Sequence, residues 1–350
     1  MSPECRTVNK YDCSASTTCR PLGQPFEANY VDGSRAAGTY YQEAYTLGSI
    51  QFQGIVGIVT DNSAQLPRGI DGIMGLWYYG QGVTVPILDR MKNATVLDTP
   101  IMGVYLKASN QTLKSLAPHQ GGEVTFGGIN SARYTGDITY INNVGPSPWT
   151  IPLSGVGVNG KAFEIKNVTA ILDTGTTAFL IPEADADLIN GAIPGAQKLP
   201  AESVWALPCN GTSTMTLTFG GFTGEVPYRD LVLEATATPS PQGMYCASTV
   251  MYPGNVFGKL DSWLIGDAFL KNVFSVYDFS DATPMGRIGL AKLAANQPDA
   301  GEGTLTPGGG GTGGGSKNSK DTSPNSGSHV GLSSMTALVV IGGTILASLL

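Results

Sequence analysis

An Asp-Thr-Gly tripeptide lies between two short apolar runs near the middle of the 350-residue chain, within residues 170–182. The flanking runs, residues 170–172 and 178–181, consist mainly of branched and apolar side chains. Such runs are typical of strands buried in a core rather than of a solvated loop. The sequence therefore predicts a buried hairpin that holds the carboxylate of Asp173 in a fixed position at its mouth.

The residues that follow Asp173 favour a catalytic role for this turn. Gly175 allows a second backbone to approach closely, and the hydroxyls of Thr174 and Thr176 can donate hydrogen bonds to the loop and to the carboxylate. A carboxylate held in this way, without a cation beside it, suits general acid/base chemistry on water. An ordinary turn is the alternative interpretation, because Asp and Gly are both common turn residues.

The composition predicts a mostly β protein. Charged residues make up only 13% of the chain, 47 residues are glycine, and Val, Ile, Thr and Tyr recur in short runs. A chain of this length can bury the core of one bilobal unit or of two domains. The net charge of -7 argues against a nucleic-acid partner.

Cysteine and histidine usage gives no support to a metal site or a nucleophilic triad. None of the cysteines forms a CxxC ligand pair, the chain has two histidines, and no GxSxG accompanies them. We therefore expect no metal and no cofactor. Two of the first three cysteines can close a small loop, and which of the three stays unpaired is open. The cysteines are Cys5, Cys13, Cys19, Cys209 and Cys246.

Glycosylation sequons indicate passage through the secretory pathway, although the polar first residues are not typical of a secretory signal. The acceptor residues are Asn93, Asn110, Asn167 and Asn210, each followed two positions later by threonine.

Three further stretches accompany the Asp173 turn. Tyr-Val-Asp-Gly-Ser at residues 30–34 predicts a β-hairpin, because Asp-Gly is a strong hairpin signal. Residues 69–76 read Gly-Ile-Asp-Gly-Ile-Met-Gly-Leu, and residues 262–270 read Ser-Trp-Leu-Ile-Gly-Asp-Ala-Phe-Leu. In this order, the four stretches together resemble the pepsin-like aspartic peptidases, in the fungal form of the hairpin. Val31 stands where the fungal pattern has glycine, which we expect to stiffen the hairpin.

The resemblance implies a bilobal, pepsin-like double β-barrel and a role for each matching residue. Asp173 is then a catalytic carboxylate, and the hairpin is the flap that closes over an extended peptide. Cys209 and Cys246 are expected to form a disulfide, and Asp267 is expected to be structural. The substrate-binding residues implied are Tyr30, Asp32 and Gly33 of the flap and Gly175, Thr176 and Thr177 of the turn.

We expect an N-terminal lobe over residues 1–141, a C-terminal lobe over residues 142–295, a linker over 296–328 and a tail over 329–350. The linker is rich in Gly and Ser, so it predicts a disordered segment. The apolar run 335–350 has 16 residues, fewer than the roughly 20 that span a bilayer. Small residues at 325–328 and the lack of a basic stop indicate a GPI-anchor signal rather than a tail-anchor helix. A yapsin-like protein attached to the cell surface or cell wall is implied.

Peptide hydrolysis in the family uses two carboxylates that share one proton and activate a water between them. The sequence has one Asp-Thr-Gly and no Asp-Ser-Gly, so we expect the chain as given to be inactive and its first lobe incomplete. Truncation before a first Asp-Thr-Gly is the favoured explanation, and a non-catalytic peptide-binding protein is the alternative. A dimer with one turn per chain is disfavoured because the chain carries both lobes, so a monomer is expected.

Overall fold

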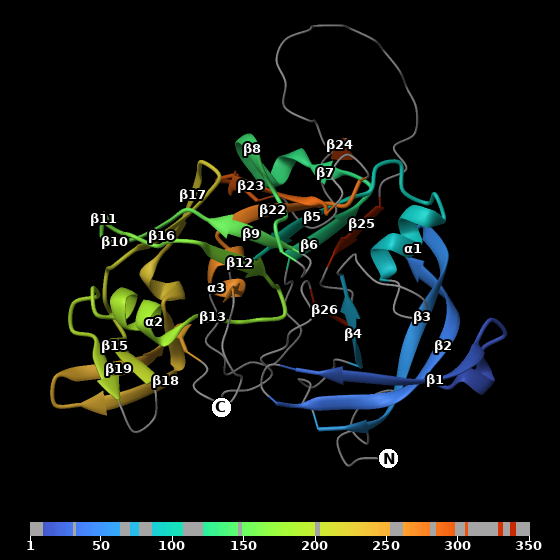
Figure 1. The fold of residues 1–350 in the computed structure, drawn as a ribbon, viewed down its shortest axis with the longest axis horizontal. Coiled ribbons are helices and arrows are strands. Elements are labelled where there is room, and N and C mark those ends of the chain that lie inside the picture. The colour runs from blue at the N-terminus through green and yellow to red at the C-terminus, as the bar shows by residue number, and fades with distance from the viewer. Residues whose placement is uncertain are drawn as a thin grey trace, which may run out of the picture.

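The computed structural model describes residues 10–30, 33–63, 71–76, 86–107, 122–145, 149–199, 204–252, 262–280, 285–297, 305–306, 328–331 and 337–340. Strands dominate these residues, as the composition predicted, and the helices are short (Figure 1). None of the helices in this part of the chain is both long and apolar enough to cross a membrane. The α-helices are α1 (Ile87–Asn93), α2 (Glu183–Asn190) and α3 (Asp267–Leu270).

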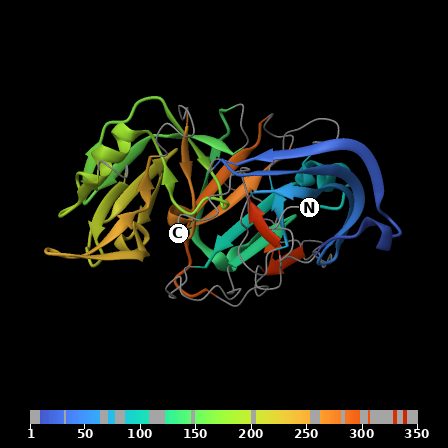
Figure 2. The same ribbon diagram turned by 90° about the horizontal axis from the view of Figure 1, so that it is seen from below.

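The N-terminal part of the described chain is a three-stranded antiparallel ribbon, drawn in blue on one side of the molecule (Figure 2). Its strands are β1 (Arg20–Asn29), β2 (Arg35–Leu47) and β3 (Ile50–Asn62). The amide of Tyr30 donates to the carbonyl of Ser34 at 2.9 Å, which closes the hairpin between β1 and β2. The sequence therefore located this hairpin correctly, while its residue Asp32 lies outside the described residues.

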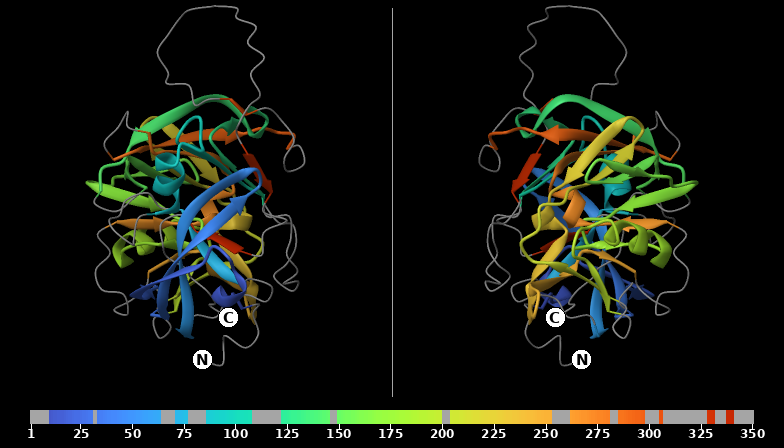
Figure 3. Two further views of the ribbon diagram at one scale, coloured as in Figure 1. Left: turned by 90° about the vertical axis from the view of Figure 1, so that its right-hand side faces the viewer. Right: turned by 90° about the vertical axis from the view of Figure 1, so that its left-hand side faces the viewer.

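A six-stranded sheet joins segments that precede and follow the Asp173 turn. In the order β25-β6-β5-β22-β23-β8, β22 pairs antiparallel with β5 and β23 pairs antiparallel with β8. Its green and orange strands cross the top of the molecule in both side views (Figure 3). The strands are β5 (Ile101–Leu106), β6 (Gly122–Phe126), β8 (Tyr134–Asn142), β22 (Val273–Asp278), β23 (Arg287–Leu293) and β25 (Ser328–Gly331).

The Asp173 turn belongs to a five-stranded sheet in the order β20-β13-β21-β12-β9. The predicted hairpin is wrong: β21 lies between the two flanking strands, parallel to β12 and antiparallel to β13. Both flanking strands are buried, so their backbone groups need partners, and β21 supplies them to both. The strands are β9 (Thr150–Leu153), β12 (Val168–Leu172), β13 (Phe179–Leu180), β20 (Val250–Met251) and β21 (Trp263–Ile265).

Two further four-stranded sheets form the side of the molecule opposite the blue ribbon (Figures 1 and 2). The sheet β11-β10-β16-β17 contains β10 (Gly155–Val158), β11 (Lys161–Phe163), β16 (Met215–Phe219) and β17 (Phe222–Val226). The sheet β14-β15-β19-β18 contains β14 (Gln197–Leu199), β15 (Val204–Pro208), β18 (Val232–Ser240) and β19 (Gly243–Ser248). Every second residue of β16 and β17 is buried, which is the alternation expected of strands with one face on the core.

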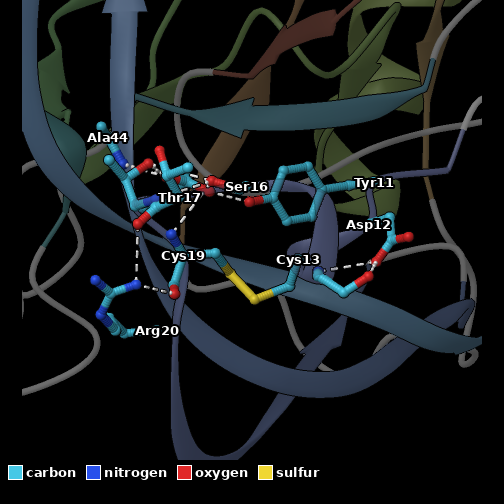
Figure 4. The surroundings of a disulfide bond; sticks show 11 residues. Tyr11, Asp12, Cys13, Ser16, Thr17, Cys19, Arg20 and Ala44 are labelled. Atoms are coloured by element: carbon cyan, nitrogen blue, oxygen red, sulfur yellow. Dashed lines mark hydrogen bonds between the residues drawn. A yellow bond between two sulfur atoms is a disulfide. The ribbon is translucent and has the colours of Figure 1, made fainter.

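Two disulfides tie local segments together. Cys13 is bonded to Cys19, in a loop where the amide of Ser14 donates to the carboxylate of Asp12 (Figure 4). Cys209 is bonded to Cys246, so the end of β15 is joined to β19. Of the first three cysteines, Cys5 lies outside the described residues.

The expected disordered tail contains short paired strands. The strand β25 pairs with β6, and β26 (Ala337–Val340) pairs in parallel with β4 (Gly72–Gly75). In addition, β24 (Leu305–Thr306) pairs with β7 (Ile129–Asn130). A strand edge offers amide and carbonyl groups to any extended segment, which allows such pairing. The tail therefore differs from the sequence prediction at these strands.

Candidate active site

The backbone around Asp173 is fixed by strands on both sides. The amide of Leu172, the last residue of β12, donates to the carbonyl of Trp149 at 3.2 Å, and the amide of Asp173 donates to the carbonyl of Ile265 at 3.0 Å. Asp173 therefore lies at the carboxyl end of the parallel pair formed by β12 and β21. Its side chain is completely buried.

Neutral donors hold both carboxylate oxygens of Asp173. The amide of Gly175 donates to Oδ1 at 2.9 Å, and the hydroxyl of Thr176 donates to Oδ2 at 2.8 Å. Hydrogen bonds of this kind favour the ionised carboxylate. A carboxylate can accept about four hydrogen bonds in all. The turn thus presents an oriented carboxylate, as the sequence predicted, with Thr176 as the donor.

Backbone hydrogen bonds from the start of α3 hold the turn that follows Asp173. The amide of Asp267 donates to the carbonyl of Thr176 at 2.7 Å, and the amide of Ala268 donates to the carbonyl of Thr177 at 3.0 Å. A Cβ added to Gly266 would lie 1.9 Å from the carbonyl oxygen of Thr176. Only glycine therefore fits at this position, which explains the Leu-Ile-Gly-Asp order read from the sequence.

Asp267 is a second buried carboxyl group in the site. Burial, followed by the charge of Asp173, raises the pKa of Asp267 to about 8. Its Oδ1 is buried and has no hydrogen-bond partner among the described residues. The family resemblance predicts a structural role for this residue, and its position in a Gly-Asp pair carries no signal of the neighbouring carboxylate.

Aromatic residues next to the turn connect it to the N-terminal part of the chain. The indole nitrogen of Trp149 donates to the carbonyl of Leu76 at 2.9 Å, and its ring meets the ring of Tyr277 edge-on at 4.9 Å. Both side chains are fully buried, and burial raises the pKa of Tyr277. Sequence reasoning missed this connection, because the residues are far apart in the chain and no local pattern marks them.

The flap and turn residues predicted from sequence lie in connections between strands of two different sheets. Tyr30 and Gly33 form the tight connection between β1 and β2, where the amide of Gly33 donates to the carbonyl of Tyr30 at 3.0 Å. Gly33 has a φ of 80°, a conformation that favours glycine. Gly175, Thr176 and Thr177 all belong to the turn that follows Asp173.

The predicted glycosylation acceptors that the structure describes are exposed, as an attached glycan requires. They are Asn93 at the end of α1, Asn167 before β12 and Asn210 after β15. Asn110 lies outside the described residues.

Comparison with known proteins finds a family profile that matches most of the chain. The sequence profile of the family described as "Eukaryotic aspartyl protease" matches residues 1–293. The aspartic protease of Phaffia rhodozyma is 32% identical over 302 residues, which cover 83% of this chain and 68% of that protein. The aspartic-type endopeptidase ctsD of Aspergillus fumigatus is 29% identical over 291 residues, covering 82% of this chain and 57% of that protein. Vacuolar protease A of Neurospora crassa is 31% identical over 80% of this chain and 68% of its own length.

Proposed function

The chain belongs to the eukaryotic aspartyl protease family, and from this premise we propose that it serves as an aspartic-type endopeptidase with Asp173 as one of two catalytic carboxylates. The observation that carries the proposal is the geometry of Asp173. Its carboxylate is buried at a strand end, and each oxygen accepts a hydrogen bond from a neutral donor. The site therefore holds a carboxylate in position while leaving it able to bind a water and exchange a proton.

Hydrolysis requires a second carboxylate beside the first. Two adjacent carboxyl groups share one proton because like charges at short range cannot both ionise, and the pair activates the attacking water. In this sequence, Asp173 is the aspartate of the one Asp-Thr-Gly turn. We therefore expect the 350-residue chain by itself to be inactive, and activity to require a partner carboxylate opposite Asp173.

An extended peptide is the proposed substrate. The hairpin carrying Tyr30, Asp32 and Gly33 would cover the peptide, and Gly175, Thr176 and Thr177 would line the opposite side. Support comes from the hairpin connection at residues 30–34 and from the turn that follows Asp173. Extended peptides suit such a site because their backbone groups pair with hairpins and strand ends.

The decisive experiment compares the wild-type protein with the Asp173→Asn variant. Both are purified from cells that express the gene from its own locus. Where the expressed protein supplies the partner carboxylate, we expect peptide hydrolysis at acidic pH that a statine-type inhibitor blocks, since its hydroxyl takes the place of the attacking water. Asp173→Asn should abolish hydrolysis and leave the circular dichroism spectrum unchanged. Hydrolysis that persists in this variant would contradict the assignment of Asp173.

A non-catalytic peptide-binding protein is the second candidate, favoured by the single Asp-Thr-Gly turn. It predicts that the purified protein binds extended peptides, in competition with the statine-type inhibitor, but does not cleave them. Peptide binding without hydrolysis in protein from the native locus would decide for this candidate.

Attachment to the outer cell surface through a lipid anchor is part of the proposal. Two disulfides fit an oxidising compartment, and the small residues at 325–328 with the apolar end of the chain fit an anchor signal. Anchoring would remove β25 from β6 and β26 from β4. Phosphatidylinositol-specific phospholipase C should release the protein from cells, and recovery of a peptide from residues 335–350 in the mature protein would rule the anchor out.

A further inference from the structure

The carboxyl group of Asp267 is buried in the site with one oxygen that accepts no hydrogen bond from the described residues. Asp267 is the first residue of α3, and its Oδ1 has no hydrogen-bond partner among the described residues. Buried polar atoms in folded proteins are nearly always bonded, so an unbonded one requires an explanation. A carboxylate in such a position would carry the full penalty of an unsolvated charge, whereas a neutral carboxylic acid carries much less.

The elements packed against α3 supply little positive charge to Asp267. The turn before it contributes Asp173, a like charge, and β22 contributes Tyr277, whose side chain is fully buried and whose pKa is raised by that burial. Lys271, just after α3, lowers the pKa of Asp267. However, its ammonium group is bound to the carboxylate of Asp230 at 2.7 Å. Its effect on Asp267 is smaller than that of burial or of Asp173.

The remaining charged groups on neighbouring strands are either paired with other residues or exposed to solvent. Asp278, at the end of β22, is paired with Arg287 at 2.7 Å. Glu225, on β17, is exposed to solvent, where its charge is screened. The surroundings of Asp267 therefore combine burial with one nearby carboxylate, and both favour the protonated form.

We propose that Asp267 is a positioning residue for Asp173, a carboxylic acid that keeps its proton in the folded protein so that Asp173 alone carries charge beneath the turn. Its backbone amide holds the turn by donating to Thr176 at 2.7 Å, and its neutral side chain adds no repulsion. The catalytic meaning of this arrangement rests on the proposed function, but its electrostatic content does not.

The sign of the resulting pH dependence follows from the two states of the chain. An unfolded Asp has a pKa near 3.8, whereas the folded pKa of Asp267 is about 8. Below about pH 4 both states are protonated, so the group adds no pH dependence. Between about pH 4 and pH 8 only the unfolded state releases the proton, so stability falls as pH rises, by at most about tenfold in the folding equilibrium constant per pH unit.

The first test measures urea unfolding of the full chain from pH 4 to pH 8. Asp267→Asn removes the titrating group. The ratio of its folding equilibrium constant to that of the wild type should therefore rise by up to about tenfold for each pH unit from pH 4 to pH 8. Asp137→Asn is the matched control, because Asp137 is exposed on β8, and its curve should run parallel to that of the wild type. If Asp267→Asn also runs parallel to the wild type, the proposal is overturned.

The second test needs no stability measurement and covers the case in which Asp267→Asn does not fold. Carbon-13 NMR of labelled aspartate carboxyl groups in the wild-type chain should show a resonance that titrates well above pH 6. Asp173→Asn should move this titration to lower pH, because it removes the neighbouring negative charge. An unchanged titration in Asp173→Asn, or no aspartate titrating above pH 6, would contradict the coupling. Neither test measures hydrolysis, so both stand or fall separately from the peptidase proposal.

Discussion

The hydroxyl of Thr176 donates to Asp173 Oδ2 at 2.8 Å, while the carbonyl of the same residue accepts from the amide of Asp267. Thr176 is completely buried, so water cannot replace either bond. Removing one partner of a buried hydrogen bond leaves the other unsatisfied, and the loss is larger when the acceptor is charged. The side chain of Thr176 thus links the orientation of the carboxylate to the stability of the lobe.

Thr176→Ala removes the hydroxyl and a methyl group, so it should lower the free energy of unfolding by about 2–4 kcal/mol. Thr176→Ser keeps the hydroxyl and removes one methyl group, so we expect a loss of about 1 kcal/mol. Urea unfolding at neutral pH measures both variants against the wild type. Equal losses in the two variants would mean that the hydrogen bond to Asp173 contributes nothing.

Local chemistry explains which residues of the site the sequence could predict. The roles of Asp173, Gly175 and Thr176 follow from neighbours within three positions, so the tripeptide and its flanks reveal them. The partner of Trp149 is Leu76, which is distant in sequence and carries no polar side chain. Its contribution is a backbone carbonyl, and no sequence pattern identifies which carbonyl a buried indole will reach.

At the scale of elements, strand existence was predictable and strand pairing was not. The runs flanking Asp173 are β12 and β13, yet β21 from much later in the chain lies between them. Apolar character indicates that a strand is buried, but it does not select its neighbour when several buried strands compete. Gly266, directly after β21, is consistent with the observed pairing, because it allows the backbone to approach Thr176 closely.

The lengths of the two disulfide-closed loops predict how much stability each disulfide contributes. Cys209 and Cys246 are separated by 37 residues, so loss of this bridge should destabilise the folded chain by about 4 kcal/mol through the entropy of the unfolded state. Replacing both cysteines with alanine and measuring urea unfolding tests this. The Cys13–Cys19 bridge spans only 6 residues and provides the comparison, with an expected loss of about 2 kcal/mol. A larger loss from the shorter bridge would contradict the loop-entropy argument.

At the scale of the whole molecule, one sheet joins strands from both of the predicted lobes. The six-stranded sheet pairs β5 with β22 and β8 with β23, so its hydrogen bonds connect chain segments on both sides of the Asp173 turn. Two lobes could be predicted from the paired motifs of the sequence. The shared sheet could not, because it depends on pairings between strands more than 100 residues apart.

Trp149 adds a side-chain connection to this shared sheet. Its indole nitrogen donates to Leu76 beyond β4, its carbonyl accepts from Leu172 next to the Asp173 turn, and its ring packs on Tyr277 of β22. Trp149→Phe keeps an aromatic ring but leaves the buried carbonyl of Leu76 without this donor. We expect a loss of about 1–3 kcal/mol in the free energy of unfolding.

The hydrogen exchange of backbone amides distinguishes a connection between the two parts from a local packing effect. In Trp149→Phe, we expect faster exchange both in β4 and in the turn after β12, because the lost bond holds Leu76 beside β4 to Trp149, whose carbonyl accepts from Leu172 before that turn. The control is Trp205→Phe, which also removes an indole donor, in this case to Asp187 at 2.8 Å. Since Trp205 and Asp187 both lie in the C-terminal part, exchange in β4 should stay unchanged in that variant. Faster exchange in Trp149→Phe that is confined to the turn after β12 would show that the indole does not couple the two parts of the molecule.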